Sequence, residues 1–286
     1  MNAEPQDVTL TAPDGVDLAA TLFRPEASNG IAVQLNAATG VPRQYYAAFS
    51  EFLASRGFTV LTYDYRGIGG SHRGHLREAR GRLLDWGTSD QSAATSWLSR
   101  HHRELRLAIV GHSLGGQILG LSPLVGETSA VLLIASQHGY FRNWPVASHL
   151  RMAFLWYLFA PLTSRVMGYF PGRLVGLSDL PGGVAREWAR WCRNPHYISD
   201  EAGVALRPFN NELRAPLRLI SFSDDPIAPR RAAERLLDYY PNAERRHDHL
   251  APEHFGVDAI GHFGFFRRSM PQSAWADAAD WLAARA

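Results

Sequence analysis

A single serine stands at the centre of the pattern G-x-S-x-G in the stretch LAIVGHSLGGQ, residues 107–117. The apolar residues before it predict a strand, and the residues after it predict a helix. In this setting the serine occupies a sharp, strained turn that lifts its hydroxyl above the end of the sheet. Gly111 and Gly115 suit such a turn because side chains there would strike neighbouring strands. Ser113 is therefore a candidate nucleophile, and the first N–H groups of the following helix face any negative charge beside it.

Two simpler interpretations of this stretch stay open on the local pattern alone. A glycine-rich phosphate loop requires G-x-x-x-x-G-K-[S/T], and this stretch contains no lysine. A purely structural turn is also compatible with the five-residue pattern. A serine hydroxyl is a weak nucleophile until a base takes its proton, and that base must be oriented by a third group. An acid and a base elsewhere in the chain therefore decide between the interpretations.

Two adjacent carboxylates end an apolar run in the stretch SDDPIAP, residues 223–229. Pro226 keeps the residue before it out of helical geometry, which places Asp225 in an extended conformation at the mouth of the predicted strand. Asp225 is the predicted orienting acid. Asp224 is the alternative, although the role of a solvated loop acid suits it better.

The base is sought among twelve histidines. His262 lies in DAIGHFGFF, beyond the last predicted strand and before the closing helix, where the flanking Gly261 and Gly264 allow an exposed, sharply turned loop. His112 lies within the turn itself and cannot readily reach Ser113. His262 is the predicted base, and the resulting order Ser-Asp-His differs from the orders in chymotrypsin and subtilisin.

A metal site is a second use for histidines in this chain. His247 and His249 share one face of a predicted strand, and His254 is close in sequence. No complete zinc-enzyme pattern follows them, so no metal is predicted. No organic cofactor is predicted either.

The elements that must position these residues follow from alternating apolar runs and amphipathic stretches. The segments that predict strands are VTLT and VDLAATLF around a turn at Asp14-Gly15, then IAVQLN, FTVLTYDY, RLAIVGH, SAVLLIAS, PLRLISF and AERRHDHL. Helical spacing of apolar residues falls between most of them, as in Ala93, Ala94, Trp97 and Leu98. This alternation predicts an α/β fold with a mostly parallel, twisted sheet and helices on both faces.

The alternation breaks between residues 140 and 213, a segment dense in aromatic side chains. Long structureless loops are uncommon in compact domains, so the segment is interpreted as a helical insertion. Loops at the carboxyl ends of the strands surround the ligand crevice, and the insertion is expected to form a cap there. The predicted division is a core domain of residues 1–139 and 214–286 and a cap of residues 140–213.

These landmarks resemble the α/β-hydrolase superfamily, in order, over essentially the whole chain: the turns DYRGIGGS and GHSLGG, the acid loop SDDPIAP and the terminal GHFGFF. Within it, the chain is similar to the serine-aminopeptidase and monoglyceride-lipase-like branch. The stretches NAATGVPRQYYAAFSEFLASRGF, DLPGGVAREWARWCRNPHY and IGHFGFFRR resemble more closely a bacterial group of predicted α/β-hydrolases without a settled substrate. The resemblance implies acyl transfer through a Ser113 acyl-enzyme, with His262 and Asp225 completing a triad.

The resemblance also implies an oxyanion hole, with two departures. The family usually has His-Gly where this chain has Asn36-Ala37, and the residue-by-residue match implies the amides of Ala38 and Leu114 as donors. The acid loop has Phe222-Ser223 in place of the common glycine, so the choice between the two aspartates stays open. The predicted substrate pocket takes side chains from these landmarks and from the cap: Asn36, His112, Trp144, Phe154, Trp156 and Phe263.

The expected reaction is hydrolysis of a carboxylic ester or thioester with an apolar acyl or alcohol group. The alternatives are an amidase or aminopeptidase, an acyltransferase, and a ligand-binding protein without turnover. An aminopeptidase needs an anionic subsite, and the predicted cap supplies few clustered acids. Dehalogenase chemistry would need a carboxylate in place of Ser113.

The amino-acid composition limits which binding partners and which cellular location can be predicted. The formal net charge of +2 comes from scattered basic residues, so nothing predicts nucleic-acid binding. The lone Cys192 and a start without signal-peptide features favour a cytoplasmic location. The stretch MAFLWYLFAPLTSRVMGYF is broken by Pro161 and Arg165, and its apolar part is shorter than the ~20 residues that span a bilayer. It is expected to be buried or to line the pocket, with a membrane-surface role as the alternative; the oligomeric state is not predicted.

Overall fold

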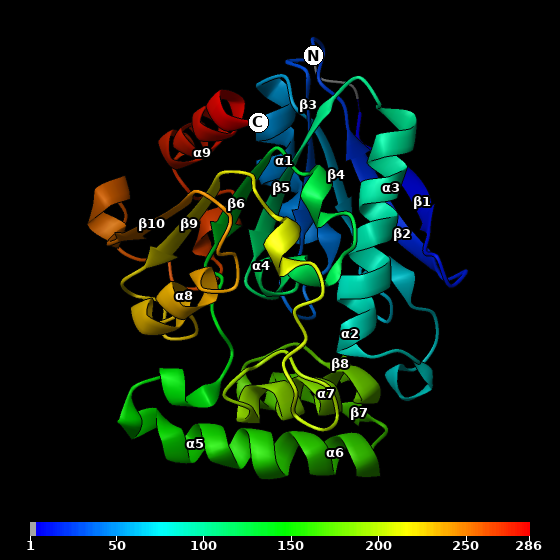
Figure 1. Cartoon of the computed structure of the whole chain (residues 1–286), viewed down its shortest axis with the longest axis vertical. Coiled ribbons are helices and arrows are strands. Elements are labelled where there is room, and N and C mark those ends of the chain that lie inside the picture. Colours follow the sequence, from blue (N-terminus) through cyan, green and yellow to red (C-terminus); the bar gives the residue numbers. More distant parts are fainter. Residues whose placement is uncertain (1–3) are drawn as a thin grey trace.

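An eight-stranded sheet runs through the centre of the protein (Figure 1) in the computed structural model, which describes residues 4–286. The strands lie in the order β1-β2-β4-β3-β5-β6-β9-β10. β2 pairs antiparallel with β1 and β4, and the other neighbours in this sheet are parallel. The strand bounds are β1 (Gln6–Thr11), β2 (Asp17–Phe23), β3 (Ile31–Asn36), β4 (Thr59–Tyr63), β5 (Arg106–His112), β6 (Ala130–Ile134), β9 (Leu217–Phe222) and β10 (Arg245–Leu250).

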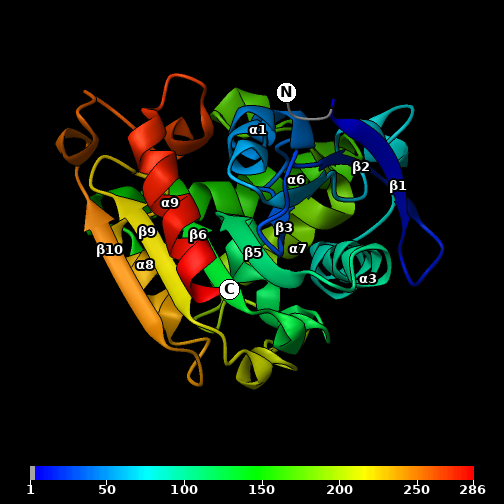
Figure 2. The ribbon, with the colours of Figure 1, turned by 90° about the horizontal axis from the view of Figure 1, so that it is seen from above.

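Helices cover both faces of this sheet (Figures 1 and 2). On one face α1 (Ala47–Ser55) and α9 (Gln272–Arg285) contact each other, and on the other α3 (Gln91–His101) and α8 (Arg230–Leu237) pack on the strands. A π-helical segment, Trp86–Asp90, joins α3 to the short α2 (Leu83–Asp85). All residues of β3, β4, β6 and β9 are buried, as expected for parallel strands covered from both sides. The predicted α/β fold class is confirmed.

The long segment between β6 and β9 supplies a third layer of helices. It contains α5 (His149–Ala153), a π-helical stretch (Phe154–Phe159), α6 (Ala160–Val166) and α7 (Gly182–Arg193), with a two-stranded sheet of β7 (Tyr169–Phe170) and β8 (Leu180–Pro181). In Figure 1 these helices lie together below the sheet, with α7 nearer to it and α5 and α6 outermost. Within residues 4–286, no helix has the length and apolar character needed to cross a membrane.

The helix expected after Ser113 is only one turn long. α4 (Leu114–Gln117) ends after four residues and is followed by two 3-10 turns, Leu119–Leu121 and Val125–Glu127. Pro123 ends the first of these turns, because it lacks an N–H and forces Ser122 into an extended conformation, with ψ of 128°. So short a helix has only a small dipole, and the electrostatic help expected from it is correspondingly small.

Candidate active site

Ser113 occupies the tight turn between β5 and α4, in a backbone conformation that L-residues rarely adopt. Its φ is 51° and its ψ is −115°, and its N–H donates to the carbonyl of Ile134 on the neighbouring strand β6. A Cβ added to Gly115 would lie 2.2 Å from the carbonyl oxygen of Asn36 on β3, and one added to Gly111 would lie 2.8 Å from Gly116 Cα. Both glycines are therefore required sterically, and the close neighbour of Gly111 is the following helix, where a strand was expected.

His262 and Asp225 meet next to this turn, from loops that are 37 residues apart in the chain. His262 Nδ1 lies 2.7 Å from Asp225 Oδ2, and both side chains are buried. The other carboxylate oxygen, Asp225 Oδ1, accepts hydrogen bonds from the amides of Ile227 at 2.8 Å and Ala228 at 3.0 Å. These two amides hold the carboxylate in one orientation, with Oδ2 presented to the imidazole.

Asp224 has a different set of contacts. Its Oδ2 accepts from the amides of Ile260 at 2.7 Å and Gly261 at 2.9 Å, immediately before His262. Gly261 has a φ of 58°, which turns the chain so that His262 faces Asp225. Asp224 thus holds the backbone of the histidine loop, and Asp225 contacts the imidazole.

One cavity, of about 340 Å³, brings the serine and the histidine together. Ser113 and His262 both line this serine cavity, with Ala38 and Thr39 from the loop after β3 and Phe263 beside the histidine. Residues from the segment before α7 line it as well, including Leu177, Ser178 and Leu180. The serine therefore opens into a space bounded both by the sheet and by the helical layer.

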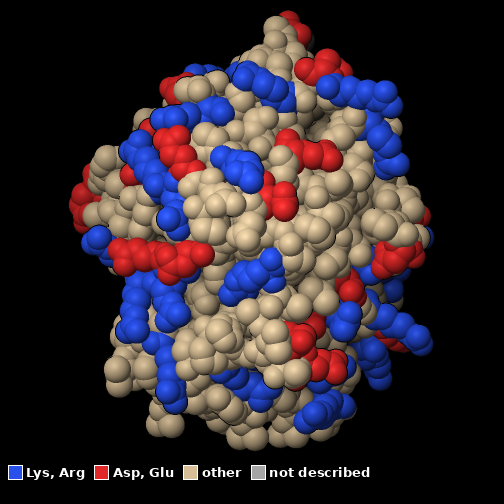
Figure 3. All heavy atoms as spheres, in the orientation of Figure 1, with Lys and Arg blue, Asp and Glu red and all other residues tan. Residues whose placement is uncertain are grey.

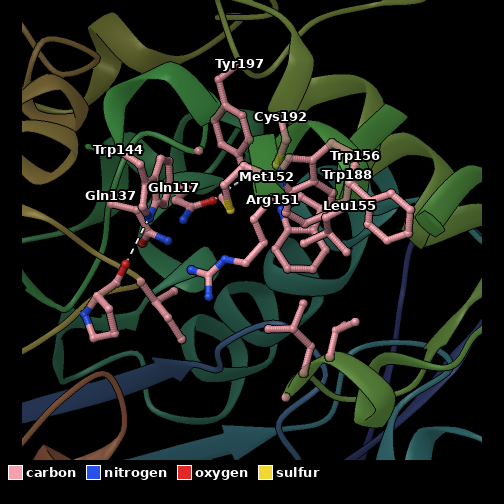
Figure 4. A pocket seen from close by; sticks show the side chains of 17 residues that line it. Gln117, Gln137, Trp144, Arg151, Met152, Leu155, Trp156, Trp188, Cys192 and Tyr197 are labelled. Carbon is pink, nitrogen blue, oxygen red and sulfur yellow. Dashed lines mark hydrogen bonds between the residues drawn. The ribbon is translucent and has the colours of Figure 1, made fainter. Parts of the chain in front are cut away.

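A second, larger cavity of about 420 Å³ adjoins the first (Figure 4). Five residues line both cavities: Gln137, Gly176, Leu177, Trp188 and Ile227. The larger cavity is mostly apolar, and Trp144, Phe154 and Trp156 of the predicted pocket are in its wall. Figure 4 shows the guanidinium of Arg151 pointing into it.

Asn36 and His112 line neither cavity, so their assignment to the substrate pocket was wrong. Asn36 is fully buried at the end of β3, where its amide group bonds to Gln34, Tyr63 and Gln91. His112 is also fully buried, and it faces away from the serine cavity into the core. The amide group of Asn36 also donates to the carbonyl of Gly115, in the turn that follows Ser113, at 3.4 Å.

A buried hydrogen-bonded chain links the predicted oxyanion loop to the histidine loop. The Ala38 amide donates to Tyr46 Oη at 2.8 Å, Tyr46 Oη lies 2.9 Å from His112 Nδ1, and His112 Nε2 lies 2.9 Å from the carbonyl of His262. Burial lowers the pKa of His112 well below its ordinary value, so its ring is neutral. The carbonyl of His262 can only accept, so Nε2 carries the proton and Tyr46 donates to Nδ1.

This chain was not foreseen from the sequence, and it bears on the oxyanion donors. The Ala38 amide already has a partner, Tyr46 Oη. Leu114 is the first residue of α4, where the N–H has no acceptor within the helix. The only signal in the sequence was the tyrosine pair Tyr45-Tyr46 shortly after the loop, which the helical spacing of apolar residues explained equally well.

The histidines considered for a metal have other partners. His247 Nε2 and His249 Nδ1 each lie 2.8 Å from Ser221 Oγ on the neighbouring strand. Among the residues that the structure describes, no group of three His, Cys, Asp or Glu side chains is placed to hold a metal ion.

Comparison with known proteins adds to this geometry. Residues 42–156 match the family model described as serine aminopeptidase, S33, a range that contains Ser113 but ends before Asp225 and His262. Mouse alpha/beta hydrolase domain-containing protein 10 has a similar structure, with 17% identity and a TM-score of 0.59 over 98% of this chain and 100% of that one. The chain has the α/β-hydrolase fold.

Two esterases are among the other proteins of similar structure. The esterase Pf2001 of Pyrococcus furiosus has 16% identity and a TM-score of 0.61, covering 99% of this chain and 91% of that one. The esterase domain of a Rhodothermus marinus protein has 19% identity and a TM-score of 0.60, covering 99% and 97%. At these identities the similarity carries the fold alone. No curated protein matches the sequence.

Proposed function

We propose that this α/β-hydrolase cleaves carboxylic esters or thioesters, with Ser113 as nucleophile, His262 as base and Asp225 as the acid that orients it. The observation that carries the proposal is the 2.7 Å contact of His262 Nδ1 with Asp225 Oδ2, beside a cavity that Ser113 and His262 share. Residues 140–213 act in this proposal as a cap, and the larger cavity beneath it receives the apolar part of the substrate.

The proposed mechanism proceeds through an acyl-enzyme. His262 Nε2 takes the proton of Ser113 Oγ as the oxygen attacks the carbonyl carbon, and the leaving group then receives that proton. Asp225 keeps the proton on Nδ1, so that Nε2 is free to accept, and stabilises the imidazolium that forms. Water activated by His262 clears the acyl group from Ser113.

The oxyanion of the tetrahedral intermediate is received by backbone amides in this mechanism. Leu114 contributes the N–H at the first position of α4. Ala38 contributes by sharing its N–H between Tyr46 Oη and the oxyanion. Loss of one such donor typically raises the barrier by about 3 kcal/mol.

Peptide substrates with a free amino terminus suit the described cavities poorly. Neither cavity is lined by an aspartate or glutamate from residues 4–286, whereas a substrate ammonium needs an anionic partner. The charged side chain in the wall of the larger cavity is the cation Arg151, which would repel that ammonium. Ester hydrolysis is therefore favoured over aminopeptidase activity, although the matching family model is named for the latter.

The test combines active-site labelling with substrate comparison. A fluorophosphonate probe should label the wild-type chain and fail to label Ser113→Ala. Wild-type enzyme should hydrolyse p-nitrophenyl esters, and not aminoacyl p-nitroanilides. Equal labelling of Ser113→Ala, or no labelling of folded wild type, would exclude the proposed nucleophile. Product analysis with an added alcohol would show whether the acyl group goes to water or to the alcohol.

A further inference from the structure

The exposed apolar side chains of this protein are concentrated on one segment. Among residues 4–286, eleven large apolar side chains are exposed, and ten of them lie between residues 146 and 175. Six follow each other at four-residue spacing along the helical run that contains α5 and α6: Val146, Leu150, Phe154, Leu158, Leu162 and Val166. All six are exposed, so they lie on the solvent side of this run, and the set is called the outer face below.

The outer face is not covered by any other part of the described chain. The opposite side of the same run packs inward, with Trp156, Ala160 and Ser164 buried, and α6 contacts α7. In Figure 1 α5 and α6 form the layer farthest from the sheet. A helix at the surface of a globular protein normally turns polar residues outward, whereas Leu150 is 85% exposed and Val146 is 81% exposed. Contiguous apolar surface of this kind marks an interaction site.

The segment that carries the outer face has charged residues of one sign only. No aspartate or glutamate occurs between residues 128 and 178, while arginines occur at positions 142, 151, 165 and 173. Arg165 is exposed next to Val166 of the outer face, whereas the exposed Arg151 points into the larger cavity. The next two acids along the chain form ion pairs: Asp179 pairs with Arg173, and the buried Glu187 pairs with Arg190. The lower rim of Figure 3, over α5 and α6, is mostly tan with blue patches.

The apolar outer face and its neighbouring arginines together indicate which kind of partner can bind there. In a two-fold dimer each outer face would meet its own copy, which would bring the arginines of both chains together without acids between them. An anionic lipid surface accepts both features, because apolar side chains enter the acyl boundary while arginines contact the headgroups. We propose that the outer face docks the protein on anionic lipid surfaces.

Docking in this orientation also involves the larger cavity. Phe154 belongs to the outer face and lines that cavity, and the exposed Arg151 and Val175 line it as well. The cavity wall therefore continues into the docking face. If the proposed esterase function holds, a lipid-borne ester reaches the cavity from the lipid side; the docking itself does not depend on hydrolysis.

The test is vesicle binding by the full chain, measured by co-sedimentation. Vesicles of phosphatidylcholine alone are compared with vesicles of phosphatidylcholine mixed with phosphatidylglycerol. The apolar variant is Leu150→Gln/Leu158→Gln/Leu162→Gln, none of which lines a described cavity. Its matched control is Val204→Gln, because Val204 is the exposed large apolar residue outside the segment. The charge variant is Arg142→Gln/Arg165→Gln, with Arg103→Gln as its control.

Wild type is expected to bind the anionic vesicles and to bind phosphatidylcholine weakly. The apolar variant should weaken binding to anionic vesicles by about tenfold or more, and the charge variant by about fivefold per arginine removed. Both controls should bind like wild type, and all variants should keep wild-type hydrolysis of a short, water-soluble ester. The same vesicle assay on Ser113→Ala separates docking from catalysis.

Three results would overturn the proposal. The first is that wild type does not bind anionic vesicles, and the second is that the triple-glutamine variant binds them as well as wild type. The third is that wild type forms a dimer in solution and the triple-glutamine substitution dissociates it. The last result would assign the outer face to a second copy of the chain. If the triple variant does not fold, as judged by circular dichroism, the arginine variant decides the outcome.

Discussion

Substituting the two adjacent aspartates one at a time tests the proposed division of labour between them. In the wild type, the amides of Ile227 and Ala228 donate to Asp225 Oδ1 at 2.8 and 3.0 Å. In Asp225→Asn, these two donors still need an acceptor at the same position. The asparagine oxygen must therefore take that position, and its NH₂ group is turned toward His262 Nδ1. Nδ1 then has to accept a hydrogen bond, which places the ring proton on Nε2 and removes the base that Ser113 needs.

The expected loss is large for one aspartate and small for the other. Forcing the wrong tautomer in a serine triad lowers kcat by about 10⁴-fold, or about 5.5 kcal/mol of barrier. In Asp224→Asn the new oxygen can still accept from the amides of Ile260 and Gly261, so kcat should fall by no more than about tenfold.

The assay is steady-state hydrolysis of a p-nitrophenyl ester, with thermal unfolding to verify that each variant is folded. The spontaneous rate is subtracted with Ser113→Ala, which should show no burst of product. The reasoning is refuted if Asp224→Asn loses as much activity as Asp225→Asn. It is also refuted if Asp225→Asn retains more than a tenth of wild-type kcat.

Three further predictions concern stability. In a urea titration, Gly115→Ala should destabilise the fold by about 3 kcal/mol or prevent folding, because its Cβ would lie 2.2 Å from Asn36 O. The control Gly126→Ala should be as stable as wild type, because its Cβ would be 3.5 Å from the nearest atom. Tyr46→Phe should lower the free energy of unfolding by about 1–3 kcal/mol, because Nδ1 of buried His112 loses its donor, and an unchanged urea midpoint would contradict this. Burial, with Arg235 and Arg207 nearby, lowers the pKa of His138 to about 3. Below pH 6.5, the ordinary pKa of histidine, His138 binds a proton in the unfolded chain but not in the folded chain. The free energy of unfolding should therefore fall as the pH drops from 6.5 towards 3. The loss should be about 2 kcal/mol between pH 7 and pH 5, and His138→Gln should flatten it in denaturant titrations at both pH values.

Much of the architecture was predictable because it rests on local rules. The eight segments predicted as strands correspond to the eight strands of the main sheet. The buried parallel strands among them, such as β3, β6 and β9, are short and mostly apolar runs that the sequence makes visible. The tight turn at Ser113 was predictable because only glycine fits at positions 111 and 115. Pro226 restricts the residue before it, which favoured Asp225 over Asp224 as the partner of the histidine.

Other features depended on contacts between segments far apart in the chain. The partner of the Ala38 amide is Tyr46, and the chain from Tyr46 ends on the carbonyl of His262, which no local pattern predicts. The same holds for Asn36 and His112, whose side chains point into the core because of how β3 and β5 sit in the sheet.

The helical run of α5 and α6 shows the difference most clearly. From the sequence, this run was predicted to be buried or to line the pocket, with a membrane-surface role as the alternative. Tertiary structure decided otherwise for one side, since the run is the outermost layer and only its inner side meets α7. Sequence determines how apolar a helix is, but the packing of the whole chain determines which of its faces is left in water, because that depends on the elements available to cover it.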